Sequence, residues 1–164
     1  MRHLNRSGSR SRGLSLIEVM VGLAISAVLL VNAAPFFGDL FINSRLREGG
    51  HVLLADAMFA QSEAIKRNGL VRLTVSGAAI EVSDRADPAN PQVLRSSALA
   101  EGLVAPTTRI DFGSEGRPTP FGTAVAINLG SAGAECSTST RCPGLRVDAG
   151  GAVRLCGNHL SSCP

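Results

Sequence analysis

The chain has 164 residues, a net charge of +3, 45% apolar residues, and neither Trp nor Tyr. This length suits one ordinary domain with a short appendage, and the apolar fraction is too high for a disordered chain. Four of the 16 basic side chains fall in the first 13 residues, which hold no acid; the rest of the chain carries 12 basic and 13 acidic side chains. A near-neutral body argues against a generally basic nucleic-acid-binding domain.

Residues 1–13 form a short segment rich in Arg, Ser and Gly, and residues 14–37 then form an apolar run of 24 positions. The run holds a single charge, Glu18, and a single amide, Asn32. A helix of this length spans about 36 Å, enough to cross a hydrocarbon core of about 30 Å. Arginines before the run and none directly after it predict a single-pass helix with its N-terminus in the cytoplasm.

An ordinary secretory signal peptide is the alternative, with Val31-Asn32-Ala33 as its cleavage site. The apolar run is longer than the usual core of such a peptide, and it carries Glu18 near its start. A charge in hydrocarbon costs about 2.5–3.5 kcal/mol, so an intramembrane Glu18 needs a reason. A carboxylate that reaches the lipid headgroups is the simpler explanation of Glu18 and stays open.

Residues 13–18, Gly-Leu-Ser-Leu-Ile-Glu, resemble the class III signal of type IV pilins and type II secretion pseudopilins. That signal is a Gly, usually a Phe, then Ser/Thr-Leu-Ile-Glu after a basic leader, and Leu14 replaces the usual Phe here. The resemblance implies that prepilin peptidase cuts between Gly13 and Leu14 and methylates the Leu14 amine. It also implies a helix kink at Pro35, where pilins of this superfamily commonly carry a proline.

The motif has a physical reason. A buried carboxylate becomes tolerable beside a cation, and the new terminal ammonium of a neighbouring subunit is such a cation. Glu18 paired with the Leu14 amine of the next subunit would set the axial register of the helices, as one buried polar group does in a coiled coil. Gly22 and Ser26, four residues apart, favour close approach of such helices.

Residues 38–68 predict a continuation of the helix, which ends at Asn68-Gly69 after two basic side chains. Gly49-Gly50 predicts a bend or local break near residue 49. Residues 57–68 resemble the close of the long helix in pseudopilin H and the FimT/FimU-type minor pilins. The predicted buried face contains mostly apolar residues three or four positions apart: Leu40, Val52, Leu54, Ala57, Met58, Ala60, Ala64 and Ile65.

Residues 69–164 predict a β-rich domain. Val71, Leu73 and Val75 alternate with polar residues, and Ser76-Gly77 predicts a hairpin turn. Residues 83–91 predict a loop, and further short strands are predicted near 93–94, 109–112, 121–129, 145–147 and 153–155. The whole pattern predicts an α+β fold in which a long, hydrophobic, pilin-like N-terminal helix packs on a C-terminal antiparallel sheet. Residues 110–127 also resemble the middle of the pseudopilin H domain.

Four cysteines, Cys136, Cys142, Cys156 and Cys163, lie near the C-terminus and agree with an oxidising compartment. Three pairings are possible, and Cys136–Cys142 with Cys156–Cys163 is favoured because short loops form readily. A zinc site assisted by His159 is the alternative, but the sequence has no Cys-x-x-Cys pair. We therefore predict no metal and no cofactor.

No nucleophile elbow, P-loop, dinucleotide fingerprint or paired metal-binding histidines occur, so we predict no catalytic residues and no enzymatic activity. Some FimT-type minor pilins take up DNA through a Gly-Arg-x-Arg motif, of which Gly151-Ala152-Val153-Arg154 keeps only the second Arg. Arg146 and Arg154, joined by Arg141, would form a weak DNA contact across the predicted hairpin. A solvated strand face is favoured instead, because the domain lacks Trp and Tyr stacking platforms.

The residues and the resemblance together predict a minor pseudopilin, a structural subunit of the type II secretion pseudopilus that serves protein secretion across the outer membrane. Its predicted segments are a leader (1–13), a transmembrane helix in the bacterial inner membrane (14–37), a periplasmic helix (38–68) and a periplasmic β-domain (69–164). Expected partners are prepilin peptidase, other pseudopilins or pilins, an inner-membrane platform with a cytoplasmic ATPase, and membrane lipid before assembly. The alternatives are a type IV pilus minor pilin for adhesion or DNA uptake, and a secreted soluble β-domain that begins at Ala34.

Overall fold

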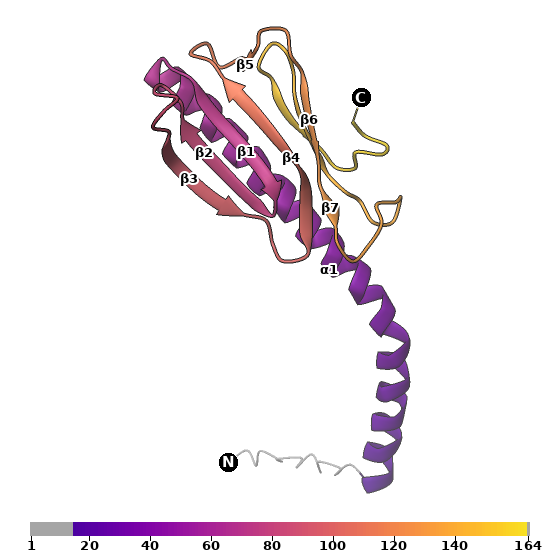
Figure 1. The fold of residues 1–164 in the computed structure, drawn as a ribbon. Helices are drawn as coiled ribbons and strands as arrows, with labels where there is room; N and C mark the ends of the chain where they lie inside the picture. Colours follow the sequence, from indigo (N-terminus) through magenta and orange to yellow (C-terminus); the bar gives the residue numbers. More distant parts are fainter. Residues whose placement is uncertain (1–14, 164) are drawn as a thin grey trace, which may run out of the picture. The chain divides into compact units, whose positions relative to one another are not determined.

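The computed structural model describes residues 15–163, with only the backbone described at 33–37. The chain divides into two compact units, Met1–Phe37 and Gly38–Pro164, which we describe separately. Its single described helix, α1, spans Leu16–Arg67 (Figure 1). The strands that follow are β1 (Val71–Gly77), β2 (Ala79–Asp84), β3 (Gln92–Ala98), β4 (Leu103–Phe112), β5 (Pro118–Thr119), β6 (Val125–Asn128), β7 (Gly130–Ser131), β8 (Gly144–Val147) and β9 (Val153–Cys156).

The start of α1 is capped by Ser15. Its hydroxyl and its carbonyl oxygen both accept hydrogen bonds from the Glu18 backbone N–H, at 3.3 and 3.1 Å. A serine at this position satisfies a backbone donor that the first helical turn leaves free. Among the described residues, no helix combines the length and the apolar character that crossing a membrane requires.

Three of the residues singled out in the sequence fall outside this description. Gly13 and Leu14 precede the described residues. The α1 backbone includes position 35, but the Pro35 side chain, on which the predicted kink depends, belongs to the side chains that are not described. Cleavage at residue 13 and the kink at residue 35 therefore stay predictions.

In the second unit, α1 packs on the sheets through small and medium-sized side chains. The predicted face is right at Ala57, Ala60 and Ala64, which are fully buried. It is wrong at Leu40, Met58 and Ile65, which are 65%, 55% and 54% exposed, because the buried stripe runs instead through Leu46, Leu53 and the alanines. Small side chains let a helix approach a sheet closely, so the alanine side of α1 faces the core.

The break predicted near residue 49 is also wrong, because α1 runs unbroken through Gly49 and Gly50. A Cβ atom on Gly49 would lie 2.6 Å from Cδ1 of Leu103, and one on Gly50 would lie 3.0 Å from Cγ of Pro143. The two glycines are therefore positions of close approach between α1 and the chain packed against it. Each costs about 1 kcal/mol in helix propensity relative to alanine, which the tight packing offsets.

The β-strands form antiparallel sheets, as predicted. The larger sheet has the order β3-β2-β1-β4-β5, with β7 paired to β4, and the smaller has the order β6-β8-β9. The β1–β2 hairpin at Ser76-Gly77 is confirmed, with Leu73 opposite Val82. Leu73 also faces Ile110 of β4, and these side chains are buried on the face of the sheet that α1 covers (Figure 1).

Several strand boundaries differ from those predicted. The strand expected at 121–129 is only β6, because Phe121 and Gly122 lie in a turn, where Gly122 has a φ of +88°. The strands near 93 and 109 are longer than expected, and the loop expected to begin at residue 83 starts after β2 ends at Asp84. The strands also form two sheets, whereas one was predicted.

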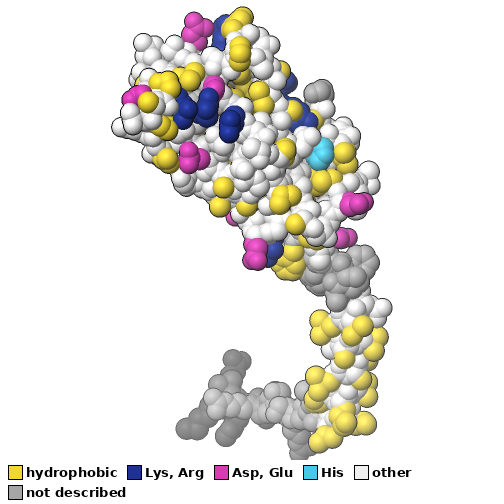
Figure 2. Space-filling view, in the orientation of Figure 1, with side chains coloured by type: hydrophobic (Ala, Val, Ile, Leu, Met, Phe, Trp, Pro, Cys, Tyr) yellow, Lys and Arg dark blue, Asp and Glu magenta, His cyan; other side chains and the backbone are white. Residues whose placement is uncertain are grey.

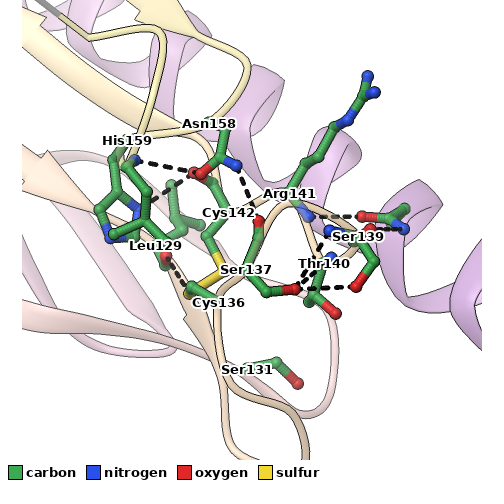
Figure 3. Close-up of a disulfide and its surroundings, with 12 residues drawn as sticks. Leu129, Ser131, Cys136, Ser137, Ser139, Thr140, Arg141, Cys142, Asn158 and His159 are labelled. Atoms are coloured by element: carbon green, nitrogen blue, oxygen red, sulfur yellow. Dashed lines mark hydrogen bonds between the residues drawn. A yellow bond between two sulfur atoms is a disulfide. The ribbon is translucent and has the colours of Figure 1, made fainter.

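The cysteines are bonded as Cys136–Cys142 and Cys156–Cys163, the pairing that the sequence favoured. The two disulfide loops contact each other, since the His159 backbone N–H donates to the Cys142 carbonyl oxygen at 2.7 Å. Buried Asn158 reinforces this contact through its amide, which donates to the Ser137 carbonyl oxygen at 2.9 Å (Figure 3). Hydrogen bonds and disulfides thus order a C-terminal region that has few strands.

Candidate functional site

Glu18 is the one charged side chain in the described apolar part of α1, and it is exposed. The other polar side chains there turn back to the helix itself. The Ser26 hydroxyl donates to the Gly22 carbonyl oxygen at 2.8 Å, and the Asn32 amide donates to the Val28 carbonyl oxygen at 2.7 Å. Among the described residues, none forms a hydrogen bond or ion pair with the Glu18 carboxylate. Glu18 therefore has no partner among the described residues of its own chain.

Apolar side chains surround Glu18 on all sides of the helix. Every described side chain from 15 to 32 is exposed, and Leu16 and Val31 reach 79% and 75% exposure. Yellow apolar side chains dominate the visible surface of this stretch (Figure 2). A helix that is apolar all round belongs in lipid or in a bundle of helices. This stretch is therefore a continuous apolar surface that the described residues leave uncovered.

A groove of about 570 Å³, which no sequence motif indicates, lies in the second unit. We call it the α1 groove. Its lining consists of the α1 residues Leu40, Asn43, Ser44, Arg47 and His51, and the C-terminal residues Arg141, Pro143, Leu155 and Gly157. The 40–51 spacing places the α1 residues on one helix face, but no sequence pattern indicates that residues 141–157 pack beside them.

Asn43 joins the two walls of the α1 groove. Its side-chain amide donates to the Ser139 carbonyl oxygen at 2.8 Å, and its side-chain oxygen accepts from the Arg141 backbone N–H at 2.8 Å. Both partners lie within the loop closed by the Cys136–Cys142 disulfide. The groove therefore has one wall on α1 and another that a disulfide and two hydrogen bonds fix in place.

Arg146 and Arg154 face each other across β8 and β9, as the hairpin predicted. The Arg154 guanidinium donates to both carboxylate oxygens of Asp148, at 3.0 and 2.8 Å, and Arg146 donates to the side-chain oxygen of Asn128 at 2.8 Å. Arg141 lines the α1 groove and not the hollow beside Arg146 and Arg154. Asp148 balances the Arg154 charge, so Arg154 offers little to a phosphate backbone, whereas Arg146 has no acidic partner among the described residues.

Charged side chains fix the end of α1. Glu63 accepts from Arg67 Nε at 2.8 Å and from Lys66 Nζ at 3.3 Å, and Arg67 also donates to Asp84 of β2 at 3.1 Å. The hydrogen bond from Arg67 lowers the pKa of Glu63 below its ordinary value, and the same bond raises the pKa of Arg67. The network joins the last turn of α1 to the larger sheet.

Two family models match parts of this chain. The family described as type II transport protein GspH matches residues 51–158, and the prokaryotic N-terminal methylation motif matches residues 8–31. No curated protein matches the chain. Two crystal forms of the type IV minor pilin FimU of Pseudomonas aeruginosa PAO1, in space groups P21 and P65, have similar folds.

The FimU structures share 17% sequence identity with this chain, at TM-scores of 0.58 and 0.55. The alignments cover 68% and 66% of this chain and 88% and 90% of the FimU chains. At this identity the likeness shows the fold, which is that of a pilin. Because the type II transport match spans most of the chain and the methylation motif precedes it, the protein belongs to the GspH family of pilin-like type II transport proteins.

Proposed function

We propose that this protein is a minor pseudopilin, a structural subunit of the type II secretion pseudopilus. Membership of the GspH family supports a pseudopilin or minor pilin role, because the family is structural. The observation that carries the proposal is Glu18, a single carboxylate without a described partner on an apolar helix within a methylation motif. A cost of about 2.5–3.5 kcal/mol for such a charge in hydrocarbon favours a dedicated partner.

The proposed maturation follows from the motif. Prepilin peptidase removes residues 1–13 by cleavage between Gly13 and Leu14 and methylates the Leu14 amine. Residues 14–37 then hold the chain in the inner membrane, with the N-terminus cytoplasmic and the second unit periplasmic. The methylation motif supports this location, since proteins that carry it are typically anchored there. The two disulfides agree with an oxidising periplasm.

In the proposed assembly step, an inner-membrane platform and its cytoplasmic ATPase move the subunit from lipid into the filament. Glu18 pairs with the Leu14 ammonium of an adjacent subunit, which sets the register between helices. Packing of the exposed apolar side chains against neighbouring helices replaces their contacts with lipid, so van der Waals packing and the Glu18 ion pair stabilise the helical core of the filament. The second unit lies outside this helical core and contacts other subunits.

Mass spectrometry of the mature N-terminus tests the maturation. We expect a chain that begins with methylated Leu14. An unmodified chain that begins at Ala34 would instead establish an ordinary signal peptide and a secreted soluble β-domain.

A type IV pilus minor pilin is the second candidate, and the FimU fold supports it. The phenotype of a gene deletion distinguishes a role in the type II secretion pseudopilus from a role in the type IV pilus. The pseudopilus proposal predicts that secreted proteins accumulate in the periplasm while surface pili persist. Loss of pili with normal secretion would favour the type IV pilus.

A further inference from the structure

We propose that the α1 groove binds a carboxylate-bearing segment of a neighbouring filament subunit that differs from this chain. The inference rests on the proposed function, because it names the chemistry of a partner within the filament. It concerns a surface separate from Glu18 and the apolar stretch, since every lining residue belongs to the second unit.

The charge of the groove indicates the partner's chemistry. Two arginines and a histidine line it, at Arg47, Arg141 and His51, and its lining residues include no carboxylate. The ion pairs formed between described residues engage five other arginines and involve neither Arg47 nor Arg141. Two guanidiniums without an acidic partner on one concave surface favour a carboxylate ligand.

The apolar part of the lining indicates that the partner is a peptide segment rather than a small anion. Leu40 is 65% exposed in the isolated chain, and Pro143 and Leu155 also face the groove. A volume of about 570 Å³ accommodates several side chains. A segment that places a carboxylate at the arginines and an apolar side chain against Leu40 would match both features.

The Arg141 wall is already ordered. The Cys136–Cys142 disulfide closes its loop, and Asn43 holds the loop backbone on both sides of residue 140. In Figure 3 the Arg141 side chain extends away from this hydrogen-bonded loop. Binding therefore orders a side chain on a fixed backbone, which lowers the entropic cost of docking.

A second copy of this chain is a poorer occupant. Among the described residues, its carboxylates without an ion pair or side-chain hydrogen bond are single and stand nine or more residues apart in the sequence: Glu18, Asp39, Glu48, Glu81, Glu101 and Glu135. Such isolated acids match two neighbouring guanidiniums less well than an acidic segment does. We therefore assign the groove to a different subunit of the filament.

Site-specific photo-crosslinking in the native cells tests the assignment with the full chain. A photoreactive phenylalanine analogue replaces Ser44, which lines the groove and is exposed. We expect a crosslink to a different pilin-like subunit, mapped by mass spectrometry to a peptide that contains Asp or Glu. A crosslink to a second copy, to lipid, or to a peptide without an acid would overturn the inference.

Charge reversal of the two groove arginines tests the role of their charge, and the same reversal of two arginines outside the groove is the control. Arg47→Glu with Arg141→Glu should lower the crosslink yield at least about fivefold, and the Gln pair should give a smaller loss. Arg45→Glu with Arg109→Glu makes the same change of net charge at exposed arginines outside the groove, and should leave the yield unchanged. An equal yield in the groove variant and the control contradicts the inference.

Rescue and filament content complete the test. Changing the crosslinked acid of the partner to Lys should restore the yield with Arg47→Glu and Arg141→Glu. Sedimentation of filaments released from the periplasm separates the two failures: if the chain is absent from these filaments, the proposed function and this inference are both wrong. If the chain is present in filaments but forms no crosslink at position 44, this inference alone is wrong.

Discussion

At the scale of single residues, a buried carboxylate ties α1 to the edge of the larger sheet. Asp56 is 2% exposed, and its oxygens accept from the Ser97 hydroxyl and, at 3.2 Å, from the Arg95 guanidinium. The same guanidinium lies 4.3 Å from the centre of the Phe59 ring. A buried carboxylate is tolerated only when such partners satisfy it, so each partner contributes to stability.

Ser97→Ala should lower the free energy of unfolding by about 1–3 kcal/mol, because it leaves one Asp56 oxygen without its donor. Ser96→Ala is the matched control, since Ser96 is the exposed neighbour on β3 and should change stability by less than about 0.5 kcal/mol. Thermal unfolding of the detergent-solubilised chain, followed by circular dichroism, measures both. Equal effects of the two variants would contradict the role assigned to Asp56.

The hydrogen-bonded Glu63 carboxylate indicates that the folded chain loses stability in acid. Its pKa in the folded chain lies below the ordinary value of 4.5, chiefly because Arg67 donates a hydrogen bond to it. Its contribution to stability is therefore fully present above the unfolded value and disappears as the pH falls through the lowered folded value.

Arg67→Gln should make the unfolding temperature less sensitive to pH across this acid range. Lys66→Gln should change it less, because the Lys66 side chain is 74% exposed and its hydrogen bond to Glu63 is longer. Unfolding temperatures at a series of pH values from neutral to acid compare the three proteins. Identical acid profiles in wild type and Arg67→Gln would exclude Glu63 as a contributor.

At the scale of the element, the packing of α1 depends on Gly49 and Gly50, the two glycines at which the sequence predicted a bend or local break. Gly49→Val should lower the free energy of unfolding by about 1–3 kcal/mol through overpacking against Leu103 and its neighbours. Gly38→Val is the control, because nothing lies within 4 Å of a Cβ there. A stable Gly49→Val variant, assayed by the same thermal unfolding, would refute the close approach.

The sequence allowed the strands of the larger sheet to be predicted where alternation was strict. Val71, Leu73 and Val75 alternate with polar residues, and the burial of β1 follows that alternation. The buried face of α1 was harder, since Leu40 and Met58 are more apolar than the alanines that pack inside. Periodicity identifies a helix, but the depth of packing between helix and sheet decides which face is buried.

At the scale of the whole molecule, the assembly motif and the groove differ in how the sequence encodes them. Residues 13–18 are contiguous, so the sequence alone indicated Glu18 and the cleavage site. The α1 groove brings Arg47 and His51 together with Arg141, which lies about ninety residues later. Such a site depends on tertiary packing, and a single sequence without covariation does not indicate it.

The central claim is that Glu18 pairs with the terminal ammonium of a neighbouring subunit during assembly. The most direct measurement compares Glu18→Ala with Glu48→Ala, an exposed carboxylate later on the same helix, by the amount of each chain in filaments released from the periplasm and sedimented. Both variants should be cleaved after Gly13 and reach wild-type levels in the membrane. The account predicts that Glu48→Ala enters filaments normally and that Glu18→Ala is lost from them; normal incorporation of Glu18→Ala would contradict it.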